Sequence, residues 1–126
     1  MSEFLADGVE LFAGICVRDH ARARPWYDAL LGGPPTFVAH EKESVWEVAP
    51  HRWLVVEERP ERAGYAVQTL FVADLDARVA AITGRGLEPT SEEVYGAGVR
   101  KVTFRDPDGN EVGFGGNPGA DLVVDA

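Results

Sequence analysis

The sequence predicts an α+β fold of two tandem modules, each with the order strand, helix and three further strands. Two observations predict it. First, Ile15–Asp19 and Leu70–Asp74 are both short apolar runs of β type that end at an Asp. Second, each run is followed by an amphipathic, helix-like stretch and then by three strand-like runs. We expect the strands to form a cupped mixed sheet whose outer face is covered by the helices.

The first module is expected to span about residues 9–59 of the 126-residue chain, which we interpret as a single domain. Asp19 is placed to cap a helix, and His20 is expected to be solvent-exposed at its start. Apolar residues then recur at helical spacing until Gly32 and Gly33 end the helix. Three strands are predicted after it: Thr36–His40, Ser44–Val48 and Trp53–Glu57.

The second module is expected to span about residues 65–115, after a linker at Pro60–Gly64. Asp74 is again placed as the helix cap, and a matching apolar stripe follows it. The segment Asp106–Asn110 has the proline and glycine spacing of a tight turn between strands. The predicted strands are Glu92–Tyr95, Arg100–Arg105 and Glu111–Gly115, and residues 116–126 are expected to be a peripheral tail.

Composition excludes several classes of function. Twelve basic and 21 acidic residues give a net charge of −9, which argues against binding nucleic acid or an anionic membrane surface. The chain contains no apolar run of the length that a membrane-spanning helix needs, and its start shows no export signal. The single cysteine, Cys16, cannot form an intrachain disulfide. We therefore expect a cytoplasmic protein.

One helix per module leaves the other face of the sheet open, and this concave face is the predicted site. Strand alternation divides each strand between this face and the helix side, and the family resemblance described below implies that the set on this face is Phe12, Val67, Thr69, Phe71, Glu111 and Gly113. Lys101 and Thr103 are added because the helix side favours their apolar neighbours. Trp46 and Trp53 are further candidates whose facing is ambiguous. Such a lining is typical of a small-molecule site and suits an aromatic or cationic ligand. The aromatic residues could equally pack in the core or in a dimer interface.

Three stretches carry a resemblance to a known family: Gly14–Asp19, Trp26–Gly32 and Phe104–Asn110. With the duplicated modules, they resemble the vicinal oxygen chelate superfamily over about residues 9–115. That superfamily includes glyoxalase I, bleomycin-resistance proteins, fosfomycin-resistance enzymes and extradiol dioxygenases. The resemblance implies pairing into a homodimer.

The metal-dependent members carry a His seven residues before the Asp that ends each opening strand, and a Glu three residues past the turn Asn. A fourth ligand comes from the equivalent strand of the first half. Carried over to this sequence, these positions are Phe12, Val67, Gly113 and Val56. Their side chains offer no oxygen, nitrogen or sulfur donor to a cation. We therefore expect no metal ion, no other cofactor and no assignable catalytic residue.

The first functional hypothesis is a metal-free protein that binds a small molecule, in the manner of the bleomycin-resistance proteins, and sequesters an aromatic or cationic drug-like ligand. The second is a glyoxalase- or dioxygenase-like lyase or isomerase with a rearranged metal site, built from Glu111 with Glu57 or His51. Glu111 could instead be a counter-charge for Lys101. The third is a structural or regulatory module whose concave face is closed by aromatic packing.

Overall fold

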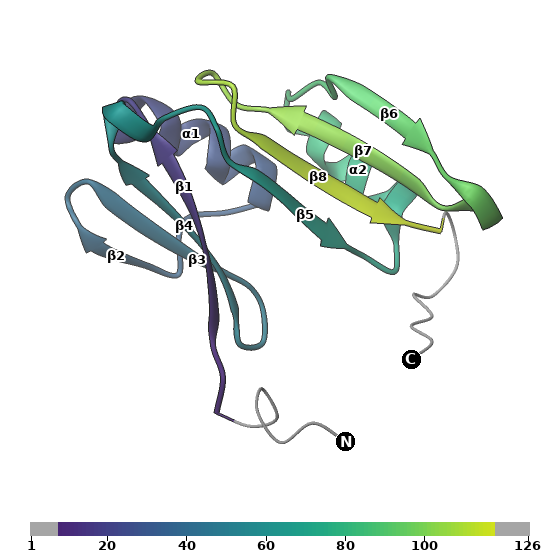
Figure 1. Ribbon diagram of the computed structural model, residues 1–126, viewed down its shortest axis with the longest axis horizontal. Coiled ribbons are helices and arrows are strands. Elements are labelled where there is room, and N and C mark those ends of the chain that lie inside the picture. Colours follow the sequence, from purple (N-terminus) through teal and green to yellow (C-terminus); the bar gives the residue numbers. More distant parts are fainter. Residues whose placement is uncertain (1–7, 118–126) are drawn as a thin grey trace.

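The computed structural model describes residues 8–117, and the predicted order of elements occurs twice in it (Figure 1). The first module consists of β1 (Leu11–Val17), α1 (His20–Leu31), β2 (Phe37–His40), β3 (Glu43–Ala49) and β4 (Arg52–Glu58). The second consists of β5 (Val67–Phe71), α2 (Leu75–Gly84), β6 (Ser91–Val94), β7 (Arg100–Arg105) and β8 (Glu111–Gly116). Single 3-10 turns lie at Pro60–Arg62 and Gly96–Gly98.

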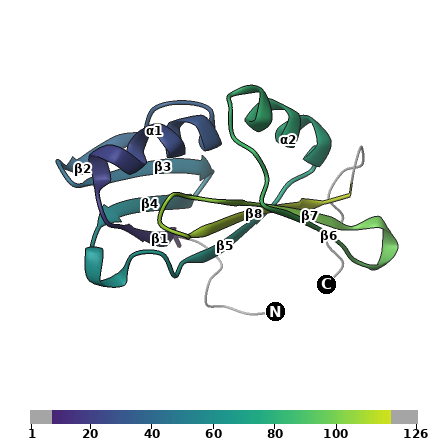
Figure 2. The same ribbon diagram turned by 90° about the horizontal axis from the view of Figure 1, so that it is seen from above.

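Each module forms its own four-stranded mixed sheet, in the orders β1-β4-β3-β2 and β5-β8-β7-β6. The opening strand of each module pairs in parallel with its last strand, and the other pairs are antiparallel. Both helices lie on the same side of the two sheets (Figure 2). The α+β fold of tandem modules is thus confirmed. Of the predicted tail, Gly116 belongs to β8, and residues 118–126 lie outside the described residues.

The two helices begin differently. The Asp19 carboxylate accepts a hydrogen bond from the backbone N–H of Arg22 at 3.2 Å, as predicted for an N-cap. Asp74 also occupies the predicted N-cap position of α2, but its side chain does not make the expected capping hydrogen bond. Its backbone, with φ −121° and ψ 56°, departs from the extended conformation that orients the Asp19 side chain. The Asp74 carboxylate instead pairs with Arg78 at 3.5 Å.

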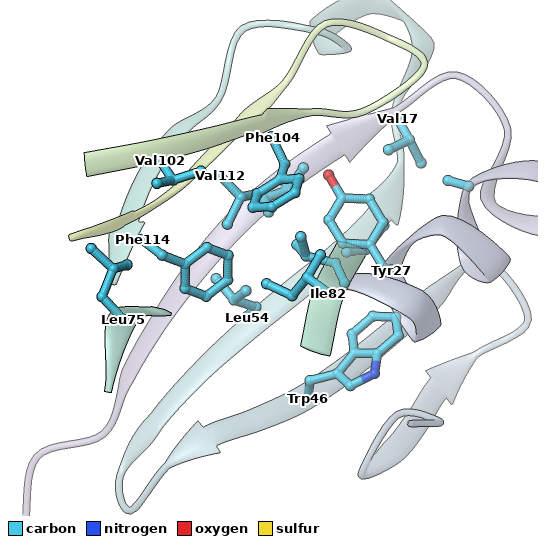
Figure 3. Packing of buried hydrophobic residues seen from close by; sticks show 14 residues of the cluster. Val17, Tyr27, Trp46, Leu54, Leu75, Ile82, Val102, Phe104, Val112 and Phe114 are labelled. Atoms are coloured by element: carbon cyan, nitrogen blue, oxygen red, sulfur yellow. The ribbon is translucent and has the colours of Figure 1, made fainter. Parts of the chain in front are cut away.

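The core lies between the helices and the sheets and draws residues from both modules (Figure 3). Tyr27 of α1 is fully buried and packs against the ring of Trp46, with ring centroids 6.1 Å apart. The Trp46 indole donates a hydrogen bond to the Gly33 carbonyl at 3.0 Å. Trp46 therefore faces α1 rather than the concave side of the sheet. In the second module, Phe104 and Phe114 meet edge to face against α2.

A buried hydrogen-bond network joins the two modules through the turn that precedes β8. The Tyr27 hydroxyl donates to the Asp106 carboxylate at 2.7 Å, and the Asn110 amide donates to the same carboxylate at 2.8 Å. Asn110 also donates to the Cys16 carbonyl at 2.8 Å and accepts from the Ala66 N–H at 2.9 Å. Burial raises the pKa of Tyr27 and the Asp106 charge adds to it, so that the phenol stays protonated and donates.

His20 is buried, which corrects the expectation that it is solvent-exposed. Its Nε2 lies 2.7 Å from the hydroxyl of Ser44 on β3, and its backbone N–H donates to Glu58 at 3.1 Å. The first residue of α1 thus points into the sheet instead of along the surface. Burial disfavours the charged imidazolium and lowers the pKa of His20.

No helix within residues 8–117 is both long and apolar enough to cross a bilayer.

The first prediction concerns the buried network. We expect Tyr27→Phe to lower the free energy of unfolding by about 1.5–3 kcal/mol, because the substitution removes a hydrogen bond to a buried carboxylate. Urea denaturation at neutral pH measures the change. Tyr65→Phe is the matched control, since Tyr65 is 86% exposed, and it should change stability by less than about 0.5 kcal/mol. An equal, small effect of both substitutions would contradict the role given to the network.

The second prediction concerns pH. The folded state holds His20 with a lowered pKa, so the unfolded chain binds the proton more readily as pH falls through about 6.5. The free energy of unfolding should therefore decline between pH 7.5 and 5.5, by at most ~1.4 kcal/mol per pH unit.

His20→Gln should flatten this decline, whereas His40→Gln, which changes an exposed histidine with only a minor effect on the His20 pKa, should change it little. Denaturation curves at several pH values test the difference. If the free energy of unfolding of His20→Gln declines with the same slope, titratable groups other than His20 cause the pH dependence.

Candidate functional site

The main hollow of the molecule lies between β1 and β5. Each of these strands is at the edge of its sheet, and neither pairs with the other. Near the end of β1 the Asn110 amide donates a hydrogen bond to the Cys16 carbonyl. Further along, the Gln68 amide of β5 donates to the Gly14 carbonyl of β1 at 3.3 Å. In Figure 1 the two strands diverge from this joined end. The space between them is a groove of about 770 Å³, lined among others by Leu11, Ala13, Leu54, Leu70, Val72 and Ala73.

Three aromatic rings form a cluster at the first-module side of the groove. Phe12 and Trp53 are stacked, with centroids 5.5 Å apart and planes 8° apart. Phe37 meets Trp53 edge to face at 5.9 Å. Trp53 lines the groove itself, and Phe12 is its cross-strand partner. Half-exposed rings held in this way offer a flat apolar surface to a planar molecule.

The orientation of the Trp53 ring is fixed by a carboxylate. Its indole N–H donates to Glu10 at 2.7 Å, and the Nδ1 of His51 lies 2.6 Å from the other oxygen of Glu10. The hydrogen bonds from Trp53 and then from His51 hold the pKa of Glu10 below its ordinary value. Glu10 therefore stays ionised at neutral pH and keeps the indole in place.

The concave face of the second module is built around two glycines of β8. Thr69 and Thr103 are the cross-strand partners of Gly113 on either side. A Cβ at Gly113 would lie 2.7 Å from Cε of Lys101, and one at Gly115 would lie 2.8 Å from the ring of Phe71. Both glycines thus give room to a neighbouring side chain that lies flat across β8. Thr103 is buried beside Gly113.

Glu111 does not act as a counter-charge for Lys101. Its carboxylate accepts from the Arg105 guanidinium at 2.7 Å, on the neighbouring strand. Val67, the cross-strand partner of Glu111, is exposed on the same face. The second module therefore presents Lys101 as a cation and a neutralised Glu111–Arg105 pair.

The strand register corrects one equivalence between the modules. Val55 pairs with Gly14, two residues after Phe12, just as Gly113 pairs with Thr69, two residues after Val67. Val55 is therefore the counterpart of Gly113, and the assignment of Val56 to that position is wrong. Val56 is fully buried on the helix side, opposite Ile15. The substitution changes no chemistry, since Val55 also lacks a donor atom.

The residues present do not fit a divalent ion. Phe12, Val67, Val55 and Gly113 offer no donor side chain. Within residues 8–117, no three His, Cys, Asp or Glu side chains lie close enough together to hold a metal. The side chains of the alternative site have other partners: Glu111 is bound to Arg105, Glu57 to Arg59 at 3.1 Å and His51 to Glu10.

The structure divides the ten candidate residues into groups. Trp53, Thr69 and Phe71 line the groove, and Phe12 stacks on its wall. Trp46 lies in the core, away from the concave side. The remaining candidates lie on the inner face of the second module, outside the lining of the groove: Val67, Lys101, Thr103, Glu111 and Gly113.

Sequence reasoning missed much of the groove, including Leu11, Leu54 and the charged residues Arg52, Asp74 and Arg78. Alternation along a strand assigns residues to one face or the other. The groove runs along two strand edges and so takes residues from both faces, such as Leu70 and Phe71 together.

Comparison with known proteins identifies the class. A profile of the glyoxalase/bleomycin resistance protein/dioxygenase superfamily matches residues 9–114. The chain therefore belongs to this superfamily, as its tandem modules indicate. A search of curated proteins gave no match.

Solved structures agree with this assignment. A glyoxalase/bleomycin resistance protein from Catenulispora acidiphila DSM 44928 is 50% identical, with a TM-score of 0.85 over 88% of this chain and 100% of that one. A bleomycin-binding protein solved with bleomycin is 17% identical, with a TM-score of 0.69 over 87% and 99% of the chains. A lactoylglutathione lyase from Agrobacterium tumefaciens is 14% identical, with a TM-score of 0.71 over 87% and 93%. The last two likenesses show the fold alone.

Proposed function

We propose that this protein binds a small organic molecule without a metal ion and holds it in the groove between β1 and β5. The observation that carries the proposal is the groove itself, about 770 Å³ in volume and lined mainly by apolar side chains with a few polar groups. Cavities of this size and make-up are typical of small-molecule sites. The residues at the metal positions of the superfamily support binding without an ion.

An aromatic ligand suits the rings of Phe12, Phe37 and Trp53, which present a flat surface beside the groove. The bleomycin-binding protein of similar fold was solved with bleomycin bound, and this supports a drug-like ligand and a role in antibiotic resistance. A cytoplasmic location belongs to the same proposal and rests on the single cysteine, Cys16.

We also propose that the protein forms a homodimer through its concave faces. Large apolar side chains are exposed there, among them Phe12, Val67 and Phe71. A two-fold partner would remove this apolar surface from water, which is the ordinary driving force of association.

The third prediction is that light scattering at micromolar concentration gives twice the mass of one chain, and that Phe71→Asp shifts the protein toward the monomer. The control is Val38→Asp on the outer strand β2, which adds the same charge at an exposed apolar position. Leu11, on the other wall of the groove, is unchanged in both variants. A monomeric mass for the unchanged protein would contradict the dimer. Equal effects of the two substitutions would place the contact elsewhere.

The fourth prediction tests ligand binding. In a thermal-shift screen of aromatic and glycopeptide antibiotics, at least one compound should raise the melting temperature, because it binds the folded state alone. EDTA should leave the shift unchanged. Ala73→Trp places a large side chain in the groove and should weaken the binding of that compound tenfold or more, by order of magnitude.

Ala77→Trp is the matched control, since Ala77 is an exposed residue of α2 outside the lining of the groove. Equal binding by both variants would place the ligand elsewhere on the protein. A shift that disappears with EDTA and returns with a divalent ion would contradict binding without metal.

A further inference from the structure

We infer that the groove selects an apolar or aromatic molecule with a single anionic group, such as a carboxylate, held between Arg52 and Arg78. The inference rests on the proposal that the groove binds a small molecule, and it names the chemical class of that molecule. The inferred ligand is therefore anionic, whereas the net negative charge of the chain suggested a cationic one.

The groove is lined by more basic than acidic side chains. Arg52, at the start of β4, belongs to the wall formed by the first module, and Arg78 of α2 belongs to the wall formed by the second. Asp74 is the single acidic side chain among the lining residues. The groove therefore has a net positive charge on a chain whose net charge is −9. A cationic ligand would meet two guanidinium groups and one carboxylate there.

These cations are available to a ligand. Within residues 8–117, Arg52 forms no ion pair. Arg78 is paired with Asp74 at 3.5 Å, and both side chains are about half exposed. Exposed pairs of this kind contribute little stability, so exchanging Asp74 for a ligand carboxylate costs little. Guanidinium groups bind carboxylates through paired hydrogen bonds.

Two acidic side chains near the groove are occupied by other partners, whereas Glu47 lines a smaller adjoining hollow together with Arg78 and Arg85. Glu10 accepts from Trp53 and His51, and Asp76 of α2 accepts from Arg100 at 2.7 Å. Glu10 and Asp76 therefore do not compete with a ligand for the two groove arginines, and Arg85 lines the smaller hollow with Glu47.

The rest of the ligand meets apolar side chains. Leu11, Leu54 and Leu70 line the same groove as the two arginines and give it apolar walls. A smaller hollow of about 150 Å³ shares Leu70, Val72 and Arg78 with the groove and reaches Trp46 and Phe114 in the core. An apolar body would lie along these walls while the anionic group stays at the rim with the arginines. Burial of the apolar part of the ligand provides the binding free energy, and the two arginines provide the selectivity for an anion.

The experiment uses three probes that share one ring system and differ in charge: 2-naphthylacetate, 2-(2-naphthyl)ethanol and 2-(2-naphthyl)ethylammonium. Calorimetric titration of the full chain at pH 7 should show naphthylacetate binding about tenfold more tightly than the alcohol, and the ammonium binding most weakly. Arg52→Gln and Arg78→Gln should each remove most of the preference for the anion and leave the affinity for the alcohol within about twofold.

Arg24→Gln is the matched control for Arg78→Gln. Arg24 forms the same kind of i,i+4 pair, with Asp28 on α1 at 3.3 Å, but lies outside the groove. This variant should keep the full preference for naphthylacetate. Loss of the preference in all three variants would mean a general effect of charge and would overturn the inference.

Two further outcomes would overturn it. Equal binding of the three probes, or binding of none, would show that the arginines do not select an anion. The antibiotic screen with Ala73→Trp tests the proposed function independently of this result. If the arginine substitutions weaken self-association and naphthylacetate dissociates the dimer, the groove is occupied by a second copy of the chain and not by an anionic molecule.

Discussion

The carboxylate of Asp106 is the constraint on which the arrangement of the modules depends. It is buried and accepts four hydrogen bonds, from the Tyr27 hydroxyl, the Asn110 amide and the backbone N–H groups of Asp108 and Asn110. A buried charge is tolerated only when its oxygens are satisfied in this way. Three of these hydrogen bonds come from the turn itself, whereas the bond from Tyr27 of the first module forms only when the modules are docked.

Asn110 extends this constraint to the strands. Its amide donates to the Cys16 carbonyl at the end of β1 and accepts from Ala66 just before β5. The two edge strands are thereby held together at one end. The Arg85 side chain makes a second connection on the helix side, where it donates to the carbonyls of Ala29 and Leu30 in the last turn of α1. The position of the groove follows from these links, since the strands separate where the links end.

The fold was predictable from the sequence because it depends on local patterns. The apolar spacing of α1 and α2, the caps at Asp19 and Gly32, and the turn at Asp106–Asn110 all act over a few residues. The failures came from long-range contacts. His20 has the polar character of a surface residue, yet Ser44 on another strand supplies a buried partner for its ring. Trp46 was ambiguous because its facing depends on which strand pairs with which.

The candidate site was predictable in part. Alternation correctly separated the core residues Ile15 and Val17 from the face that carries Phe12. Alternation could not reveal a groove that runs along strand edges, and it did not assign Arg52 or Arg78 to the site. The error at Val56 has a geometric origin. The β3–β4 connection turns at His51, with φ 66°, and is shorter than the turn before β8, so an alignment on the two prolines shifts the register by one residue.

The unpaired edges of β1 and β5 also bear on how the protein behaves at high concentration. An open strand edge is a template for pairing with a strand of another molecule, and proteins ordinarily cover or disrupt such edges. Here each edge shields the other near Cys16 and Ala66, where the modules are joined. The shielding ends toward Leu11 and Phe71, both exposed and apolar. Intermolecular strand addition at these two inner edges would therefore begin at the open end of the molecule, in addition to the outer edges β2 and β6, which are exposed along their length.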